Sequence, residues 1–136
     1  MSNSIVLLIQ LTRSVYRRAS EDVLGLKLKA YMVLTNLRAG ALPQADLCAS
    51  MQMDANNTVL LLNDLEGKGY VERRRDPADR RRHIVAITDS GHEALARAER
   101  AMESLEAEVF GPLGAEDRAT LRELLARAVS DEPAAV

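Results

Sequence analysis

The sequence predicts a mainly helical protein with one small β-hairpin. The chain has 136 residues, which is the size of a single domain. Apolar residues make up 47% of it and aromatic residues only 3%, so the core has to be built from aliphatic side chains, which suits helix-on-helix packing. Only residues 70–88 change from helical spacing to strand-like alternation, and this change predicts the hairpin.

Six helices are expected from the apolar spacing, the capping residues and the breaks. Ser4, Asp54 and Thr88 each precede a helical pattern, and short polar side chains accept hydrogen bonds from the free N–H groups of a first turn. Gly69 is the natural left-handed residue beyond a helix end. The first helix has an apolar face wider than one packing partner needs. The predicted helices cover residues 4–20, 27–37, 44–50, 55–67, 89–109 and 115–129.

Two alternating segments, residues 70–75 and 83–88, form the predicted hairpin. Val71, Val85 and Ile87 are its inward positions, and residues 76–79 supply the turn. Two short helices joined by a tight turn come directly before it. This order of elements predicts a winged helix-turn-helix in a single unit of residues 1–136.

The charge is unevenly distributed along the chain. The net charge is −2, but residues 68–82 hold seven basic and three acidic side chains. From residue 92 to the end there are ten acidic residues and five arginines. An anionic partner meets a local field and not the whole-molecule sum, so the basic hairpin is the candidate for contact with phosphates.

The second helix of the helix-turn-helix is the candidate reader of DNA bases, because such a helix fits the major groove. Asparagine pairs bidentately with adenine, and a leucine such as Leu60 suits a thymine methyl group. The alternative is that Asn56 and Asn57 only help to cap the helix after Asp54. The outward residues are Asn56, Asn57, Val59, Leu60 and Asn63.

The hairpin contributes a cluster of arginines. Arg80, Arg81 and Arg82 lie at its tip, where guanidinium groups suit a narrow minor groove. Arg73 and Arg74 are expected to contact phosphates. The alternative is that these arginines only solvate a surface hairpin. Their position after a capped helix and a glycine stop favours the DNA-binding interpretation.

Residues 65–82 read LEGKGYVERRRDPADRRR and are followed by ITDSG at residues 87–91. This stretch resembles the MarR family of bacterial regulators. The family pattern is a leucine–glutamate pair, a glycine–hydrophobic–valine step, the D-P-x-D-R-R wing and an L-T-x-x-G entry to the next helix. The resemblance also covers residues 25–37 and extends more loosely over nearly the whole chain.

The resemblance implies a homodimer that binds double-stranded DNA at a pseudo-palindromic operator. A DNA-binding lobe would span residues 26–88, and residues 1–22 and 89–130 would form a helical dimerisation lobe from both chain ends. Asp79 would pair with Arg81 and orient it for the minor groove. Family members usually repress their own or neighbouring operons, so a sequence-specific repressor is expected.

Many family members also release DNA when a small aromatic or anionic effector binds between the lobes. Tyr16 and Tyr31 are the candidate effector contacts, although core packing explains them equally well. Asp64 and Glu66 are expected as structural residues near the helix end. Where many relatives carry arginine or serine, this chain has Val59 and Leu60. Base readout is therefore expected to depend on asparagine and apolar contacts.

Other functions are less well supported. Redox-sensing cysteines of the family lie near the N-terminal dimer helix, whereas Cys48, the single cysteine, is on the short helix before the recognition helix. It is therefore interpreted as a buried small residue more readily than as a redox switch. With His83 and His92 it forms no ligand-spaced cluster, so no metal site or cofactor is expected. No catalytic set indicates an enzyme. The apolar residues 5–9 are too few for a signal peptide or membrane span, which predicts a cytoplasmic protein.

The alternative function is a winged-helix protein-interaction module that has lost DNA binding. Such a module would sequester a partner through its acidic helices. The acidic total charge and the missing recognition-helix arginine favour this alternative modestly.

Overall fold

The structure is a computed structural model that describes residues 3–130. Within that range it is mainly helical with a small antiparallel sheet, which confirms the predicted class. The count of six helices was wrong, because the described residues form seven helices and a third strand. The elements are α1 (Ser4–Arg18), α2 (Glu21–Leu24), α3 (Leu28–Leu37), β1 (Leu42–Pro43), α4 (Gln44–Met51), α5 (Ala55–Gly67), β2 (Val71–Arg75), β3 (His83–Ile87), α6 (Asp89–Val109) and α7 (Ala115–Ser130).

The two additional elements are too short to produce a periodic pattern. The single turn of α2 is capped by Ser20, and Gly25 follows it with φ +76° in the left-handed region. The two residues of β1 become a strand only because they pair with β3, where Leu42 lies opposite Val85. The first helix is capped by Asn3 instead of Ser4, since Oδ1 of Asn3 accepts from the Val6 N–H at 2.9 Å.

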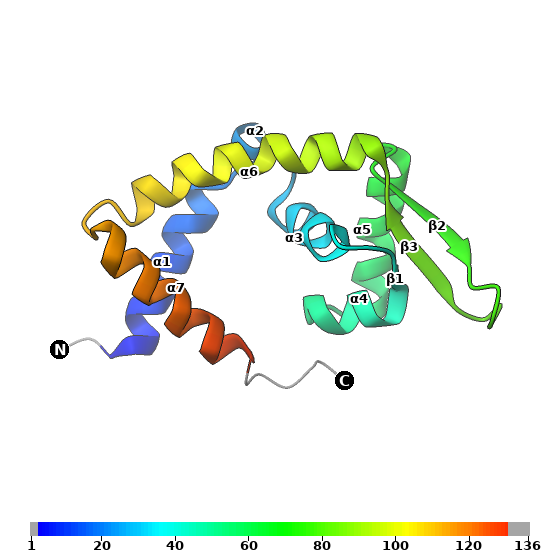
Figure 1. The fold of residues 1–136 in the computed structure, drawn as a ribbon, viewed down its shortest axis with the longest axis horizontal. Coiled ribbons are helices and arrows are strands. Elements are labelled where there is room, and N and C mark those ends of the chain that lie inside the picture. Colours follow the sequence, from blue (N-terminus) through cyan, green and yellow to red (C-terminus); the bar gives the residue numbers. More distant parts are fainter. Residues whose placement is uncertain (1–2, 131–136) are drawn as a thin grey trace.

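The sheet has the strand order β1–β3–β2, and all neighbours are antiparallel. Val71 pairs with Ile87 and Arg75 pairs with His83. Val71 and Val85 are buried, as the alternation predicted. The hairpin of β2 and β3 therefore projects from the helices with its turn farthest from the core (Figure 1).

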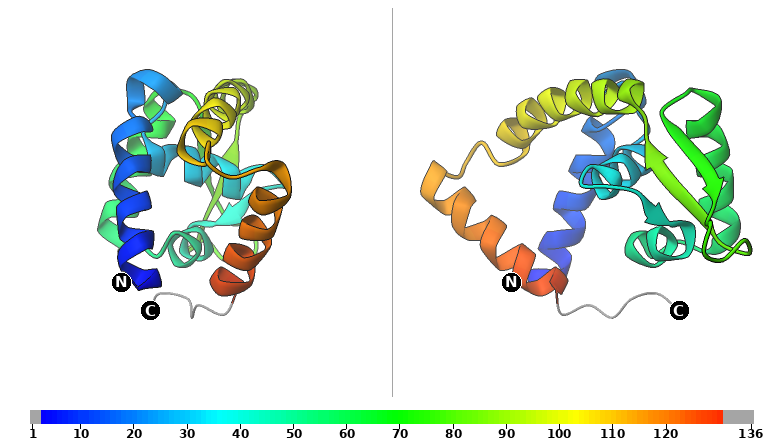
Figure 2. Two further views of the ribbon diagram at one scale, coloured as in Figure 1. Left: turned by 90° about the vertical axis from the view of Figure 1, so that its left-hand side faces the viewer. Right: turned by 45° about the vertical axis from the view of Figure 1, so that its right-hand side comes forward.

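The long helix α6 runs along one side of the molecule and joins its two ends (Figure 1). At one end α1 and α7 descend from it, and at the other end lie α3, α4, α5 and the sheet (Figure 2). The helix packs against α1, α2 and α3. Nη1 of Arg18 on α1 lies 3.1 Å from Oε2 of Glu108 on α6, which ties these two helices together.

The start of α6 packs tightly against Gly69 and Tyr70, which connect α5 to β2. Thr88 caps α6 by accepting from the Gly91 N–H at 3.0 Å, and its hydroxyl donates to the Gly69 carbonyl at 2.6 Å. A Cβ on Gly91 would lie 2.2 Å from the carbonyl oxygen of Tyr70. Only glycine fits this approach, so this contact fixes the long helix against the residue that precedes β2.

The helices α1 and α7 expose apolar side chains, and no described residue of either helix is buried. The exposed set on α1 is Ile5, Val6, Leu7, Leu8, Ile9, Leu11 and Tyr16, and that on α7 is Leu124, Leu125 and Val129. No helix within residues 3–130 has the length and apolarity needed to cross a membrane. Exposed apolar surfaces of this kind are typical of protein–protein contact sites.

Candidate nucleic-acid interface

The helix-turn-helix is formed by α4 and α5. The chain turns at Gln52, whose φ of +52° lies in the left-handed region, and Asp54 caps α5. Oδ1 of Asp54 accepts from the Asn57 N–H at 2.7 Å, as the sequence predicted. Leu62 and Leu65 are fully buried, so the opposite face of α5 is turned outward.

Three exposed residues lie on the outward face of α5, and we call them the exposed stripe: Asn56, Leu60 and Asn63. Their spacing of four and three residues places them in one line along the helix. Asn57 lies beside this stripe, and its amide nitrogen donates to Oδ2 of Asp54 at 2.9 Å. This contact agrees with the capping alternative for Asn57. Val59 is half-buried on the other flank.

The wing tip presents an ordered arginine. Nε and the backbone N–H of Arg81 both donate to Oδ1 of Asp79, each at 3.1 Å. These hydrogen bonds hold the pKa of Asp79 below its ordinary value. The expected pairing of these two residues is confirmed, and the Arg81 side chain remains 91% exposed.

Arg73 has a different environment from the one expected. Its Nη2 lies 3.2 Å from Oε1 of Glu66 and also donates to the side-chain oxygen of Asn63. The side chain is only 19% exposed, so its guanidinium faces residues of its own chain. Hydrogen bonds from Arg73 lower the pKa of Glu66. Arg73 thus joins the wing to α5.

Among the other wing arginines, one is hydrogen-bonded within the wing and three are exposed. Nη1 of Arg75 donates to the carbonyl of Arg80 at 2.8 Å and braces the turn. Arg74, Arg80 and Arg82 are exposed residues. The structure therefore brings Arg80, Arg81 and Arg82 together at the tip, as the sequence predicted, and separates Arg73 from them.

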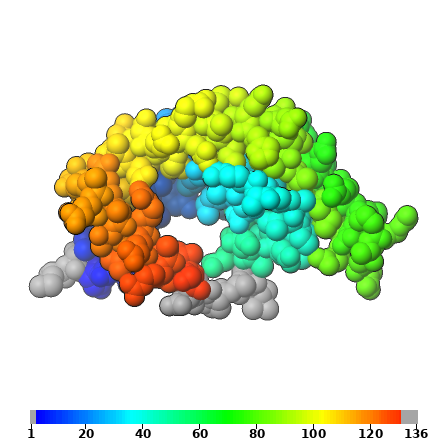
Figure 3. Space-filling model, viewed as in Figure 1, coloured from blue at the N-terminus to red at the C-terminus, as the bar shows by residue number. Residues whose placement is uncertain are grey.

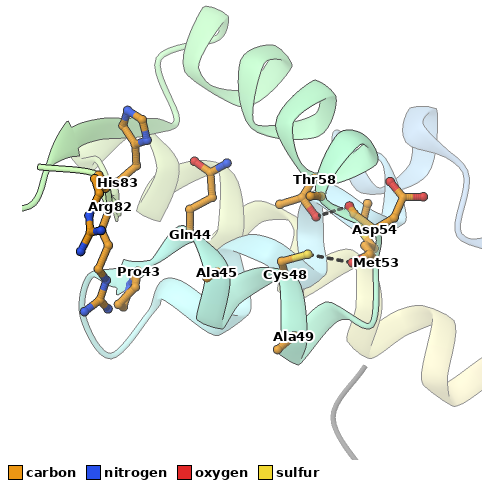
Figure 4. Close-up of a pocket in the computed structure, with 12 residues that line it drawn as sticks. Pro43, Gln44, Ala45, Cys48, Ala49, Met53, Asp54, Thr58, Arg82 and His83 are labelled. Atoms are coloured by element: carbon orange, nitrogen blue, oxygen red, sulfur yellow. Dashed lines mark hydrogen bonds between the residues drawn. The ribbon is translucent and has the colours of Figure 1, made fainter. Parts of the chain in front are cut away.

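A cavity of about 550 Å³ lies between α4, the start of α5 and the residues of the wing that lead into β3 (Figure 4). Gln44, Cys48 and Thr58 line it, together with Arg82 of the wing. Sγ of Cys48 donates to the Met53 carbonyl at 2.7 Å. Cys48 is only partly buried, not fully enclosed as expected, because it faces this cavity.

The two candidate effector contacts lie in different cavities. Tyr16 lines one of about 460 Å³ together with Lys27 and Lys29 at the start of α3. Asn57, Leu60, Leu61 and Asp64 on one flank of α5 form the opposite wall. Tyr31 lines another of about 300 Å³ with Glu99 and other residues of α6. The structure thus does not bring the two tyrosines together.

Comparison with known proteins agrees with this arrangement. The model of the MarR family matches residues 24–82. The uncharacterized HTH-type transcriptional regulator YdgJ of Bacillus subtilis is 32% identical over 114 residues, which cover 77% of this chain and 70% of the relative. The transcriptional regulator HosA of Escherichia coli is 35% identical over 65 residues, or 48% of each chain.

Solved structures share the whole fold. A probable transcriptional regulator from Pseudomonas aeruginosa is 26% identical with a TM-score of 0.81, covering 93% of this chain and 97% of that one. A variant of MarR from Escherichia coli, complexed with operator DNA, is 25% identical with a TM-score of 0.77, covering 90% of each chain. These relatives are regulators and not enzymes. This chain belongs to the MarR family of winged-helix DNA-binding transcriptional regulators.

Proposed function

We propose that this protein is a cytoplasmic, homodimeric repressor of its own or a neighbouring operon. The observation that supports this most directly is that one cavity joins the two elements, because Ala55 and Thr58 at the start of α5 line it together with Arg81 and Arg82 of the wing tip. In the proposed complex two copies of α5 enter successive major grooves of a pseudo-palindromic operator, roughly 34–36 Å apart.

The contacts divide between bases and backbone. Side chains of α5 face the base edges, and the tip arginines enter the minor groove or contact phosphates. Asp79 orients Arg81, and Arg73 stays bound to Glu66, from where its positive charge attracts the phosphates. The proposed base-facing residues are Asn56, Asn57, Val59, Leu60 and Asn63, and the proposed backbone and minor-groove residues are Arg73, Arg74, Arg80, Arg81 and Arg82.

The dimer is supported by the apolar faces of α1 and α7, which no other part of the described chain covers. Figure 3 shows a hollow beneath α6, between α7 and the lobe that contains α3 and α4. Helices of a second copy would fill it and bury these faces. Residues 1–22 and 89–130 then form the dimerisation lobe, and residues 26–88 the DNA-binding lobe.

A small aromatic acid is the proposed effector. The cavity at Tyr16 has an aromatic ring, two lysines and an apolar wall. Asn57 and Leu60 of α5 also line it, so a ligand there touches the recognition helix directly. Binding would alter the position of α5 and weaken the complex with DNA. A mobility-shift assay in the presence of aromatic carboxylates tests this step, and the band of the DNA complex should weaken as the carboxylate is added.

The decisive experiment is a mobility-shift assay with the DNA upstream of the protein's own gene. We expect a discrete shifted band that resists excess unrelated DNA, and none for a variant with Arg80, Arg81 and Arg82 all changed to Ala. The matched control changes Arg97, Arg100 and Arg127 of α6 and α7 to Ala, which removes the same charge far from the wing. If no DNA shifts at low salt, the protein-interaction module is favoured instead.

A further inference from the structure

Asn63 lies on the exposed stripe of α5 and next to the wing strand β2. Its side-chain oxygen accepts a hydrogen bond from Nη2 of Arg73. A guanidinium group carries donors only, so the amide oxygen and not the amide nitrogen has to face it. The two N–H donors of Asn63 therefore lie on the other side of the amide, away from Arg73.

Arg73 is itself held in place by Glu66. Nη2 of Arg73 lies 3.2 Å from Oε1 of Glu66, and Nε of Arg73 lies 3.5 Å from Oε2 of Glu66. The backbone N–H of Arg73 also donates to Oε2 of Glu66 at 3.1 Å. Charge-assisted hydrogen bonds of this fork type fix the plane of a guanidinium group. The orientation of the Asn63 amide is thus set by a chain of contacts that begins at Glu66.

We infer that Asn63 presents hydrogen-bond donors to the DNA and selects guanine, with Glu66 acting as a positioning residue through Arg73. This inference rests on the proposed entry of α5 into the major groove. An unconstrained asparagine reads adenine by using its oxygen and its nitrogen together. With the oxygen bound to Arg73, Asn63 prefers a base edge made of acceptors. Guanine offers O6 and N7, whereas adenine would oppose the amide donors with its own amino group.

The test is selection from a randomised duplex library with the full chain, followed by affinity measurements on the selected duplex. We expect one guanine per half-site whose preference over adenine falls about 3- to 10-fold in Asn63→Ala, the worth of one or two neutral hydrogen bonds. Glu66→Gln should weaken the same preference, and combining it with Asn63→Ala should add nothing. The control is Glu72→Gln, which makes the same charge change at the exposed residue next to Arg73 in the chain. This variant should leave the base preference unchanged.

A base contact is separated from a phosphate contact by replacing that guanine with its 7-deaza analogue. The wild-type protein should lose affinity for the modified duplex, and Asn63→Ala should not. The base readout would be overturned if the selection enriched adenine at this position, or if Asn63→Ala kept the wild-type base preference. It would also be overturned if Asn63→Ala lost the same affinity for all sequences. A Glu66→Gln profile identical to wild type would overturn the positioning role. If no sequence is enriched at all, the proposed function itself fails.

Discussion

Nε of Arg81 lies 3.1 Å from Oδ1 of Asp79, although the arginine side chain is almost fully exposed to solvent. An exposed arginine usually samples many rotamers, and ordering it on binding costs free energy. The carboxylate of Asp79 and its hydrogen bond from the Arg81 backbone N–H restrict this sampling before DNA arrives. The wing tip is therefore partly preorganised.

Arg81→Ala should weaken binding to all DNA sequences by about tenfold at low salt, because a charge-assisted contact is worth about 1.5–3 kcal/mol and part of it is screened. The slope of log K against log salt should also fall by about 1. A salt titration by fluorescence anisotropy measures both. Arg100→Ala on α6 is the control for charge alone. Unchanged affinity and slope in Arg81→Ala would contradict the minor-groove role.

Asp79→Asn should also weaken binding, but less than Arg81→Ala, because the arginine remains and only its orientation is lost. In the double variant the loss should equal that of Arg81→Ala by itself, since Asp79 acts through Arg81. The same anisotropy assay gives the four affinities of this double-mutant cycle, for wild type, the two single variants and the double variant. Additive losses would mean that Asp79 affects DNA binding by another route.

The Glu66–Arg73 pair should give a defined pH dependence of folding stability. Arg73 lowers the pKa of Glu66 in the folded state, so the pair stabilises the fold at pH values above the ordinary glutamate pKa. That contribution is lost as the pH falls through the lowered folded-state pKa. The difference in unfolding free energy between wild type and Glu66→Gln should thus be constant from pH 8 to about 5.5 and shrink below about pH 4. Urea unfolding at a series of pH values measures it, and a difference that grows on acidification would refute the pairing.

Gly91→Ala should destabilise the fold by about 1–3 kcal/mol, because the new methyl group would collide with the Tyr70 carbonyl and with Ile87. Gly67→Ala is the matched control, since a Cβ there meets no atom within 4 Å. In that helical position alanine should stabilise by about 0.4–1 kcal/mol. Chemical denaturation measures the change in unfolding free energy of both variants, and the two changes should have opposite signs. Equal changes would argue against the close packing of α6 on Tyr70.

Leu8→Glu should convert a dimer into a monomer, since a charge would be buried without a partner in the proposed interface. In an isolated chain Leu8 is 48% exposed, and the same change would cost little. Analytical ultracentrifugation measures the outcome. Val23→Glu, an equally exposed apolar position on α2, is the control. A Leu8→Glu variant that sediments exactly as wild type would exclude this face as the interface.

Local signals in the sequence predicted most of the secondary structure. Asp54 and Thr88 cap their helices as expected, and Gly69 has the positive φ of a residue beyond a helix end. These predictions succeeded because a cap or a turn depends on residues within three or four positions. The hairpin of residues 70–88 followed from alternation, which is equally local.

The arginines of the wing were identified by the sequence, but their separate roles were not. Arg73 and Arg81 belong to the same basic run, yet one is held by Glu66 and the other extends into solvent from Asp79. The Asp79–Arg81 pair spans two residues and was implied by the family resemblance. The contact between Arg73 and Asn63 spans ten residues and crosses from a strand to a helix, so no local pattern reports it.

By itself the sequence determined six of the seven described helices, the caps at Asp54 and Thr88, the arginine-rich hairpin and the family. Tertiary structure alone decided that Leu42 and Pro43 form a strand, because a two-residue strand exists only through its partner β3. It also decided that Tyr16 and Tyr31 line separate cavities, and that Asn63 receives the guanidinium of Arg73. Each of these depends on how α5, α6 and the wing are packed together, and packing joins residues that the chain keeps far apart.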